Sequence, residues 1–174
     1  KIGGALFLRN INLVLFFLCV FTQNVAYVSG ASYILEYTTI LLNLKSLYLA
    51  NYAETGGCFT SQNNVHVKSL NCTFLNNTAK TGGAAYIGNC KFFANVNSKL
   101  NGNKAVSAGS FYVTDLHHRL VTINSLFHMN SALNSGGAMY LHNINKIQVW
   151  NCSCSSNYVK SAGGVIYALG CRQI

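Results

Sequence analysis

A glycine-containing marker recurs along the 174-residue chain at an almost constant spacing. A small residue follows each marker glycine, and an aromatic residue usually stands two positions further on. The glycines are Gly4, Gly30, Gly57, Gly83, Gly109, Gly137 and Gly164, at intervals of 26, 27, 26, 26, 28 and 27 residues. A repeat of this length is typical of a solenoid, in which each repeat forms one coil and stacks on its neighbours.

A second marker has the form aromatic-x-x-Asn-x-Ala and follows the same period. Asparagine tolerates left-handed turn conformations, and stacked side-chain amides can hydrogen-bond along the axis of a solenoid. We therefore expect a structural asparagine ladder formed by Asn24, Asn51, Asn77, Asn103, Asn130 and Asn157.

The residues before each asparagine predict a strand. Positions seven, five and three before it are mostly apolar or small, and the position six before it is mostly polar, which is the period of two of a half-buried strand. The sequence thus predicts that positions seven, five and three point inward, and that positions four, six and eight point outward. Position seven holds Phe17, Leu44, Leu70, Val96, Ile123 and Trp150.

A second strand is expected after each glycine marker, and a shorter third strand between these two. A coil of 26–28 residues is too short to hold a helix as well, and no period of 3.6 residues competes. The predicted fold is all-β: a single-stranded parallel β-helix of about six coils, covering residues 1–174 as one repeat segment. Because no polar segment caps either end, we expect a piece of a longer chain, or ends that partners cover.

The clearest repeats pair residues 74–77 (Phe-Leu-Asn-Asn) with 82–86 (Gly-Gly-Ala-Ala-Tyr), and 127–130 (Phe-His-Met-Asn) with 136–140 (Gly-Gly-Ala-Met-Tyr). This pairing resembles the polymorphic membrane protein repeat of chlamydial and large protist surface proteins. The resemblance covers nearly the whole chain, with departures at Thr60, Leu100 and Cys154. It implies a right-handed β-helix of the pectin-lyase-like kind, in secreted or cell-surface proteins used for adhesion and display.

The composition offers little for catalysis. The net charge of +9 arises because Glu36, Glu54 and Asp115 are the only acids, and the bases are scattered, so no specific nucleic-acid binding is expected. A carbohydrate-active enzyme, either a polysaccharide lyase or a glycoside hydrolase, is the alternative for this fold. Glycoside hydrolysis needs two carboxyl groups about 5–9.5 Å apart, whereas Glu36 and Asp115 lie three coils, or about 14 Å, apart. The column mate of Glu54 is Lys80, which predicts an ion pair.

The seven cysteines and five histidines do not suggest a bound cofactor or metal. Cysteines in one column lie two or three coils apart, too far for a disulfide, so we expect mostly buried thiols. Cys152 and Cys154 are expected to point toward the same inner face. The adjacent histidines His117 and His118 face opposite ways on a strand. An ice-binding function would need Thr-x-Thr ladders, which are absent.

Three sequons and one apolar patch are the remaining candidate sites. Asn71, Asn76 and Asn151 begin Asn-x-Ser/Thr sequons, so they are possible N-glycosylation sites. Four apolar residues occupy positions that are expected to point outward in the first two coils, and these are Phe16, Leu18, Val20 and Leu47. They predict a contact patch, unless the first strand is shifted by one residue and turns them inward.

The sequence therefore predicts a non-catalytic structural or adhesive β-helix segment, located extracellularly or at the cell surface. Its partners would be other protein chains, further coils of the same chain or glycans. The apolar stretch at residues 11–21 is too short to span a bilayer and falls in phase with the repeat.

Overall fold

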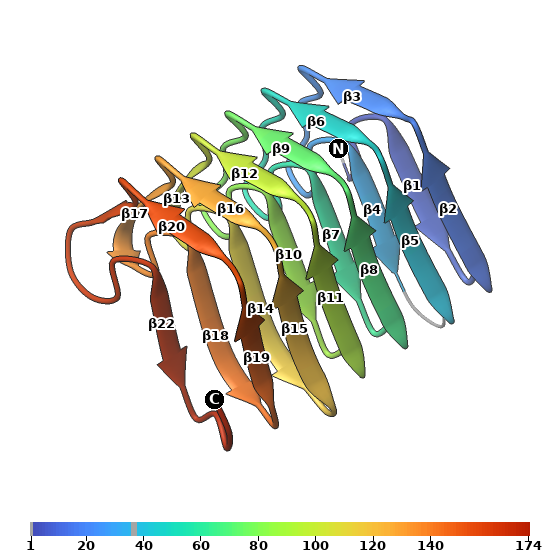
Figure 1. Ribbon diagram of the computed structural model, residues 1–174. Coiled ribbons are helices and arrows are strands. Elements are labelled where there is room, and N and C mark those ends of the chain that lie inside the picture. The colour runs from blue at the N-terminus through green and yellow to red at the C-terminus, as the bar shows by residue number, and fades with distance from the viewer. Residues whose placement is uncertain (1, 36–37) are drawn as a thin grey trace.

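The computed structural model describes residues 2–35 and 38–174, and they form a parallel β-solenoid of about six turns (Figure 1). The predicted all-β repeat fold is confirmed. Each turn contributes one strand to each of three long sheets, and corresponding strands of successive coils lie side by side. The chain therefore winds around an interior that runs along the solenoid axis.

The first sheet contains the strands that follow the glycine markers: β1 (Leu6–Arg9), β4 (Ser32–Leu35), β7 (Phe59–Gln62), β10 (Ala85–Gly88), β14 (Phe111–Leu116), β18 (Met139–Ile144) and β22 (Ile166–Leu169). The second sheet contains β2 (Leu13–Phe17), β5 (Ile40–Leu44), β8 (His66–Leu70), β11 (Phe92–Val96), β15 (Arg119–Ile123) and β19 (Ile147–Trp150). All pairs in both sheets are parallel.

The third sheet leads to the asparagine turns and contains β3 (Val20–Thr22), β6 (Leu47–Leu49), β9 (Thr73–Leu75), β12 (Lys99–Asn101), β16 (Leu126–His128) and β20 (Ser153–Ser155). A short fourth sheet contains β13 (Lys104–Ser107), β17 (Ser131–Ser135) and β21 (Tyr158–Val159). Its register shifts from Ala105↔Ala132 to Ser107↔Ser135. This bulge takes up the extra residue of the one 28-residue interval.

The asparagine ladder is confirmed, and its central members satisfy all their side-chain hydrogen-bonding groups. The Oδ1 atom of Asn103 accepts from the backbone N–H and the Nδ2 atom of Asn77, both at 3.0 Å. The Nδ2 atom of Asn103 donates to Asn130 Oδ1 and to the carbonyl oxygen of Phe74, again at 3.0 Å. The residue before each ladder asparagine, and not the asparagine, has a positive φ, as at Asn76 (53°) and Met129 (52°).

Five of the seven markers have two glycines, which meet different geometric requirements, and Ser29 and Ala108 stand at the first position of the other two. The first, for example Gly82 with φ of 67°, has a left-handed backbone conformation. The second needs the absence of a side chain, because a Cβ atom on Gly83 would lie 2.1 Å from the carbonyl oxygen of Gly109 in the next coil. The recurring doublet therefore allows both the turn and the close stacking of coils.

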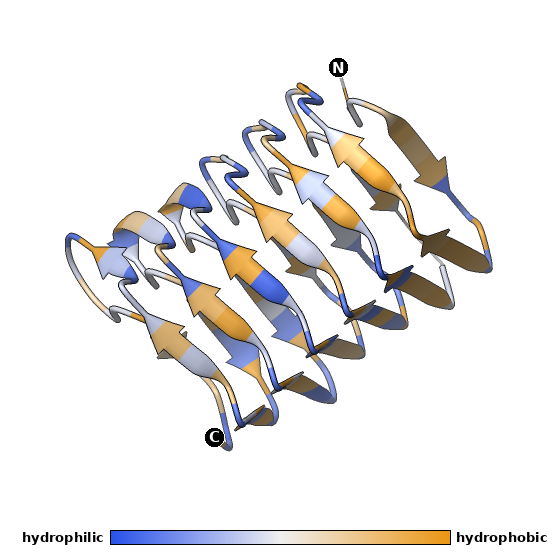
Figure 2. Cartoon of the chain, turned by 45° about the horizontal axis from the view of Figure 1, so that its top comes forward, coloured by the Kyte–Doolittle hydropathy of each residue, from blue (hydrophilic) through white to orange (hydrophobic). Residues whose placement is uncertain are grey.

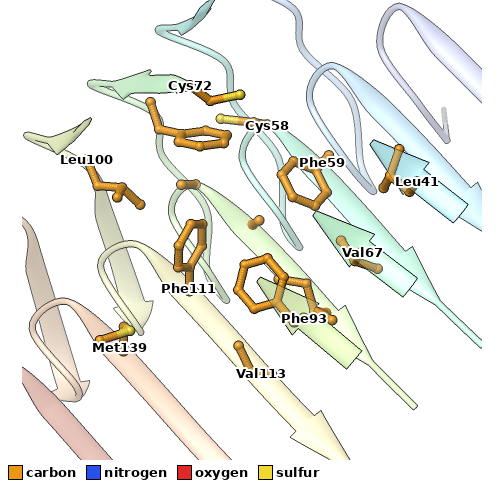
Figure 3. Close-up of a cluster of buried hydrophobic side chains, with 14 of the residues drawn as sticks. Leu41, Cys58, Phe59, Val67, Cys72, Phe93, Leu100, Phe111, Val113 and Met139 are labelled. Carbon is orange, nitrogen blue, oxygen red and sulfur yellow. The ribbon is translucent and has the colours of Figure 1, made fainter. Parts of the chain in front are cut away.

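The interior is filled by stacked apolar side chains. Phe21, Tyr48 and Phe74 form a stack with ring centroids 5.0 and 5.1 Å apart, and Phe127 lies buried in the same column. Phe59, Phe93 and Phe111 approach from the facing sheets and fill the space between them (Figure 3). Each such burial is favourable by roughly 1.5–3 kcal/mol. Figure 2 shows the complementary pattern, with apolar colour along the strands and hydrophilic colour at many of the turns.

The predicted side-chain directions are wrong for two columns of the second sheet. Position eight before the ladder asparagine points inward: Asn43, Ser69 and Asn95 are buried there. Position seven, which was expected inside, points outward. The reason is the residue six before the asparagine, such as Asn97 with φ of 52°, whose left-handed conformation interrupts the alternation between the second and third sheets.

Candidate binding face

The correction of these directions places a continuous apolar row on the outside of the molecule. Position seven before the ladder asparagine lies in register on all six strands of the second sheet. Phe17 is 50% exposed and Trp150 is 72% exposed at the two ends, and the four residues between them are half-buried. The row consists of Phe17, Leu44, Leu70, Val96, Ile123 and Trp150. We call the outward surface of the second sheet the binding face.

The two other rows of the binding face change character along the axis. In the first two coils they are apolar, and Leu13 and Leu15 are both more than half exposed. In the next three coils these rows contain His66, Lys68 and Arg119 together with Phe92, Ala94 and Val121. Both aliphatic and basic groups are thus presented on one side of the solenoid, which is the side formed by β2, β5, β8, β11, β15 and β19 in Figure 1.

The basic part of the binding face forms an open cleft of about 380 Å³, which we call the basic cleft. It is lined by His66, Lys68, Lys91, Phe92, His118 and Arg119. The Arg119 guanidinium carbon lies 5.4 Å from the centroid of the Phe92 ring, and the His66 ring meets the same ring edge-on. These contacts hold the planar groups of the cleft against an apolar wall. The arrangement can bind an anionic group.

The predicted contact patch is partly corrected by the structure. Leu18 and Val20 are exposed and Leu47 is half-buried, in agreement with the expected directions. Phe16 was wrongly included, because it is 7% exposed and packs edge-on against Phe21 in the core. The neighbouring Leu15 and Phe17 point outward in its place. The sequence signal that would have found them is the column of left-handed residues, mostly asparagines, between the second and third sheets.

The two described carboxylates are engaged in structural interactions. Glu54 forms the expected ion pair with Lys80. Asp115 accepts hydrogen bonds from Asn143 Nδ2 at 2.7 Å and from Thr114 Oγ1 at 2.8 Å, and both bonds lower the pKa of its carboxyl group. A carboxyl group with a lowered pKa is a poor general acid at neutral pH. Glu36 lies outside the described residues.

The cysteines and histidines do not assemble into a metal site within the described part of the chain. All seven cysteines are free thiols. Cys58, Cys72 and Cys90 are buried, and burial raises the pKa of each thiol, to about 11 for Cys90. Cys154 shares a column with the buried Phe127, as expected, but it is exposed in β20, the end strand of the third sheet in the described residues. The expected burial of this thiol is therefore not observed.

The aromatic residues that follow the glycine markers form a tyrosine ladder on the first sheet. Tyr86, Tyr112, Tyr140 and Tyr167 stack with centroid separations of 5.4, 4.6 and 5.3 Å. Partial burial and the neighbouring phenols raise the pKa of Tyr112 to about 12. Each tyrosine ring stacks on its neighbours in the column, which leaves little ring face for a ligand to stack on. We therefore interpret the ladder as structural.

The sequon asparagines are all exposed, which is compatible with glycan attachment. Asn71, Asn76 and Asn151 each have a left-handed backbone conformation at a corner of the coil. Asn151 also donates a hydrogen bond from Nδ2 to Asn124 Oδ1 at 2.9 Å. Their glycosylation stays a prediction.

Residues 2–35 and 38–174 contain no helix that could cross a bilayer. The sequence model of the Chlamydia polymorphic membrane protein repeat matches residues 71–88, which run from the third sheet through the ladder residue Asn77 to the glycine doublet and β10. No curated protein and no solved structure matches the chain. The matched repeat is that of outer-membrane and surface proteins of Chlamydia. The expected resemblance is therefore confirmed: this solenoid contains a repeat of the polymorphic membrane protein type.

Proposed function

We propose that the chain is a non-catalytic, adhesive β-helix segment of a secreted or cell-surface protein, and that the binding face contacts its partner. The observation that carries this proposal is the apolar row from Phe17 to Trp150, which follows the axis across six coils on the outside of the molecule. Large exposed apolar patches in soluble proteins usually mark interaction sites. The repeat at residues 71–88 supports a surface location.

The size of the binding face fits this role. Six strands about 4.8 Å apart and about 17 Å long present roughly 500 Å². The apolar row and the basic cleft share this area, so a partner can contact both over several coils.

Attachment of chain-coated beads to cultured cells tests the adhesive role. Leu44→Ser with Leu70→Ser removes two side chains from the middle of the apolar row, and we expect attachment to fall strongly. Leu75→Ser with Leu126→Ser is the matched control, because these half-buried leucines point outward from the third sheet. Equal attachment by all three proteins would refute the proposal.

The non-catalytic part of the proposal has a separate test. Neither described carboxylate is free to act as a proton donor, so incubation with polyuronates and neutral glycans should release no product. A release of oligosaccharides that Asp115→Asn abolishes would favour a carbohydrate-active enzyme instead.

A further inference from the structure

The binding face combines exposed apolar side chains with positive charge, and among its described residues no acid compensates that charge. Lys68 and Arg119 lie on strands of the sheet, and Lys45 lies at the turn after β5. Lys91 and His118 immediately precede β11 and β15. The strands of the second sheet and the turns that flank them contain no Asp or Glu in the described residues. The two described acids lie elsewhere: Asp115 is in β14 of the first sheet, and Glu54 pairs with Lys80.

This charge distribution restricts what can cover the face. A second copy of the chain placed face to face would bring two basic clefts together, with no acid among the described residues of the interface. Like charges in such an interface oppose association. An anionic partner, in contrast, would neutralise the basic cleft while the apolar row was buried.

The layout of the face matches an anionic lipid surface. Proteins that lie on bilayers present Leu, Phe and Trp toward the boundary between headgroups and acyl chains and Lys and Arg toward the headgroups. Phe17 and Trp150 stand at opposite ends of one row, five strand spacings or about 24 Å apart, so the apolar contacts are spread over a broad side of the molecule. The aliphatic stems of Lys68 and Arg119 can lie along this surface while their charged ends reach phosphate groups.

We propose that the binding face docks on bilayers that contain anionic lipids, with the apolar row at the level of the headgroups and the basic cleft holding lipid phosphates. This inference rests on the proposed function, since it names the partner of the same face. It assigns roles to Lys68, Lys91 and Arg119 that the adhesive proposal alone does not require.

The chain contains its own reporter for this contact. Trp150 is the only tryptophan and lies at one end of the apolar row. Insertion of an exposed indole among headgroups shifts its emission to shorter wavelength. We expect this shift, together with co-sedimentation, for vesicles of phosphatidylcholine mixed with phosphatidylglycerol, and much less of both for phosphatidylcholine alone or at high salt.

Paired variants separate the basic cleft from general positive charge. Lys68→Gln with Arg119→Gln should weaken the partition constant for anionic vesicles about 25-fold, or about fivefold per residue. Lys99→Gln with Lys104→Gln removes the same charge from the third and fourth sheets, and we expect a change of about twofold or less. Leu15→Ser with Phe17→Ser should weaken binding about tenfold or more and leave its salt dependence intact.

Two outcomes would overturn the inference: no vesicle binding by the intact chain, or equal losses in the cleft and control variants. A third result is that the intact chain fails to bind vesicles while beads coated with it still attach to cells, and Leu44→Ser with Leu70→Ser still reduces that attachment. This combination would identify the partner as an acidic protein or glycan. In that case the bilayer inference fails and the proposed function stands. If bead attachment is also unaffected by Leu44→Ser with Leu70→Ser, both fail.

Discussion

At the scale of single residues, the stacking distance between coils decides which side chains each column accepts. The second marker glycine lies under the backbone of the next coil, whereas the last one, Gly164, has no atom within 4 Å of the position of an added Cβ. An added methyl group would therefore clash at Gly83 and meet open space at Gly164, so alanine substitutions at these two glycines can be compared directly.

Gly83→Ala should be strongly destabilising, because the new methyl carbon would lie 2.1 Å from the Gly109 carbonyl oxygen and 2.7 Å from that of Lys104. Relief of such a clash requires the coils to separate, so we expect a loss of several kcal/mol, beyond the roughly 1–3 kcal/mol of ordinary overpacking. Gly164→Ala should be neutral or slightly stabilising, by about 0.4–1 kcal/mol. Urea unfolding followed by circular dichroism measures both. Similar midpoints for the two variants would contradict the close-approach explanation.

The asparagine ladder leads to a second comparison between residues of one column. Asn103→Ala removes the acceptor of two Asn77 donors and the donor to the Phe74 carbonyl, all in the interior. With an unsatisfied buried group costing about 1–3 kcal/mol, the free energy of unfolding should fall by at least about 3 kcal/mol. Asn24→Ala removes only the Nδ2 bond to Asn51 and should cost about 1 kcal/mol. Thermal unfolding of both variants measures the two losses in stability. Equal losses would show that the buried hydrogen bonds of the ladder contribute little to the free energy of unfolding.

At the scale of elements, the sequence predicts the strands but not all of their directions. The constant spacing identifies the columns, and the columns of Asn77 and Tyr86 stack in the expected register. The second sheet was misassigned because its inward column contains Asn43, Ser69 and Asn95, which look like solvent-facing residues. Some polar atoms of these side chains have hydrogen-bond partners inside the coil. For example, the Tyr48 hydroxyl donates to Asn43 Oδ1 at 2.8 Å. Period-two reasoning cannot detect such buried partners, and it assumes an uninterrupted strand.

Two leucines of β5 test the corrected directions. Leu41 is fully buried, whereas Leu44 lies in the outward apolar row and is half-buried. Leu41→Ala should cost about 2–5 kcal/mol through the lost contacts and the cavity left behind. Leu44→Ala should cost less than about 1 kcal/mol, because surface changes are usually small. Chemical denaturation of the two variants provides the measurement, and the reverse order would restore the direction expected from the sequence.

At the scale of the whole molecule, the repeat makes the fold largely predictable and the binding face only partly so. The exposed Leu18 and Val20 were expected, but the apolar row was not, since it was placed inside. The basic cleft was missed because Lys68, Lys91 and Arg119 are 23 and 28 residues apart and look scattered in a linear sequence. Stacking brings their columns together, and only a correct assignment of strand directions would have revealed the cleft.

The arrangement of the thiols predicts their order of reaction across the molecule. Cys58, Cys72 and Cys90 are buried and burial raises the pKa of each, so in the folded protein they should resist alkylation at neutral pH. Cys154 is exposed and should react first, even though partial desolvation raises its pKa too. Timed labelling with iodoacetamide and peptide mass spectrometry gives the order, and unfolded protein serves as the reference. Early modification of Cys90 in the folded chain would show that the coils open.

The bulge between β13 and β17 affects how a gene for such a chain can change. An additional residue is accommodated at that corner, where the register passes from Ala105↔Ala132 to Ser107↔Ser135, and the three long sheets continue in register on either side. Insertions there leave the ladder and the binding face intact, whereas one residue added inside a strand of the second sheet would reverse the directions of those that follow it. Recombination can therefore lengthen the chain by whole coils, and small insertions can accumulate at this corner, without altering the surface that faces the partner.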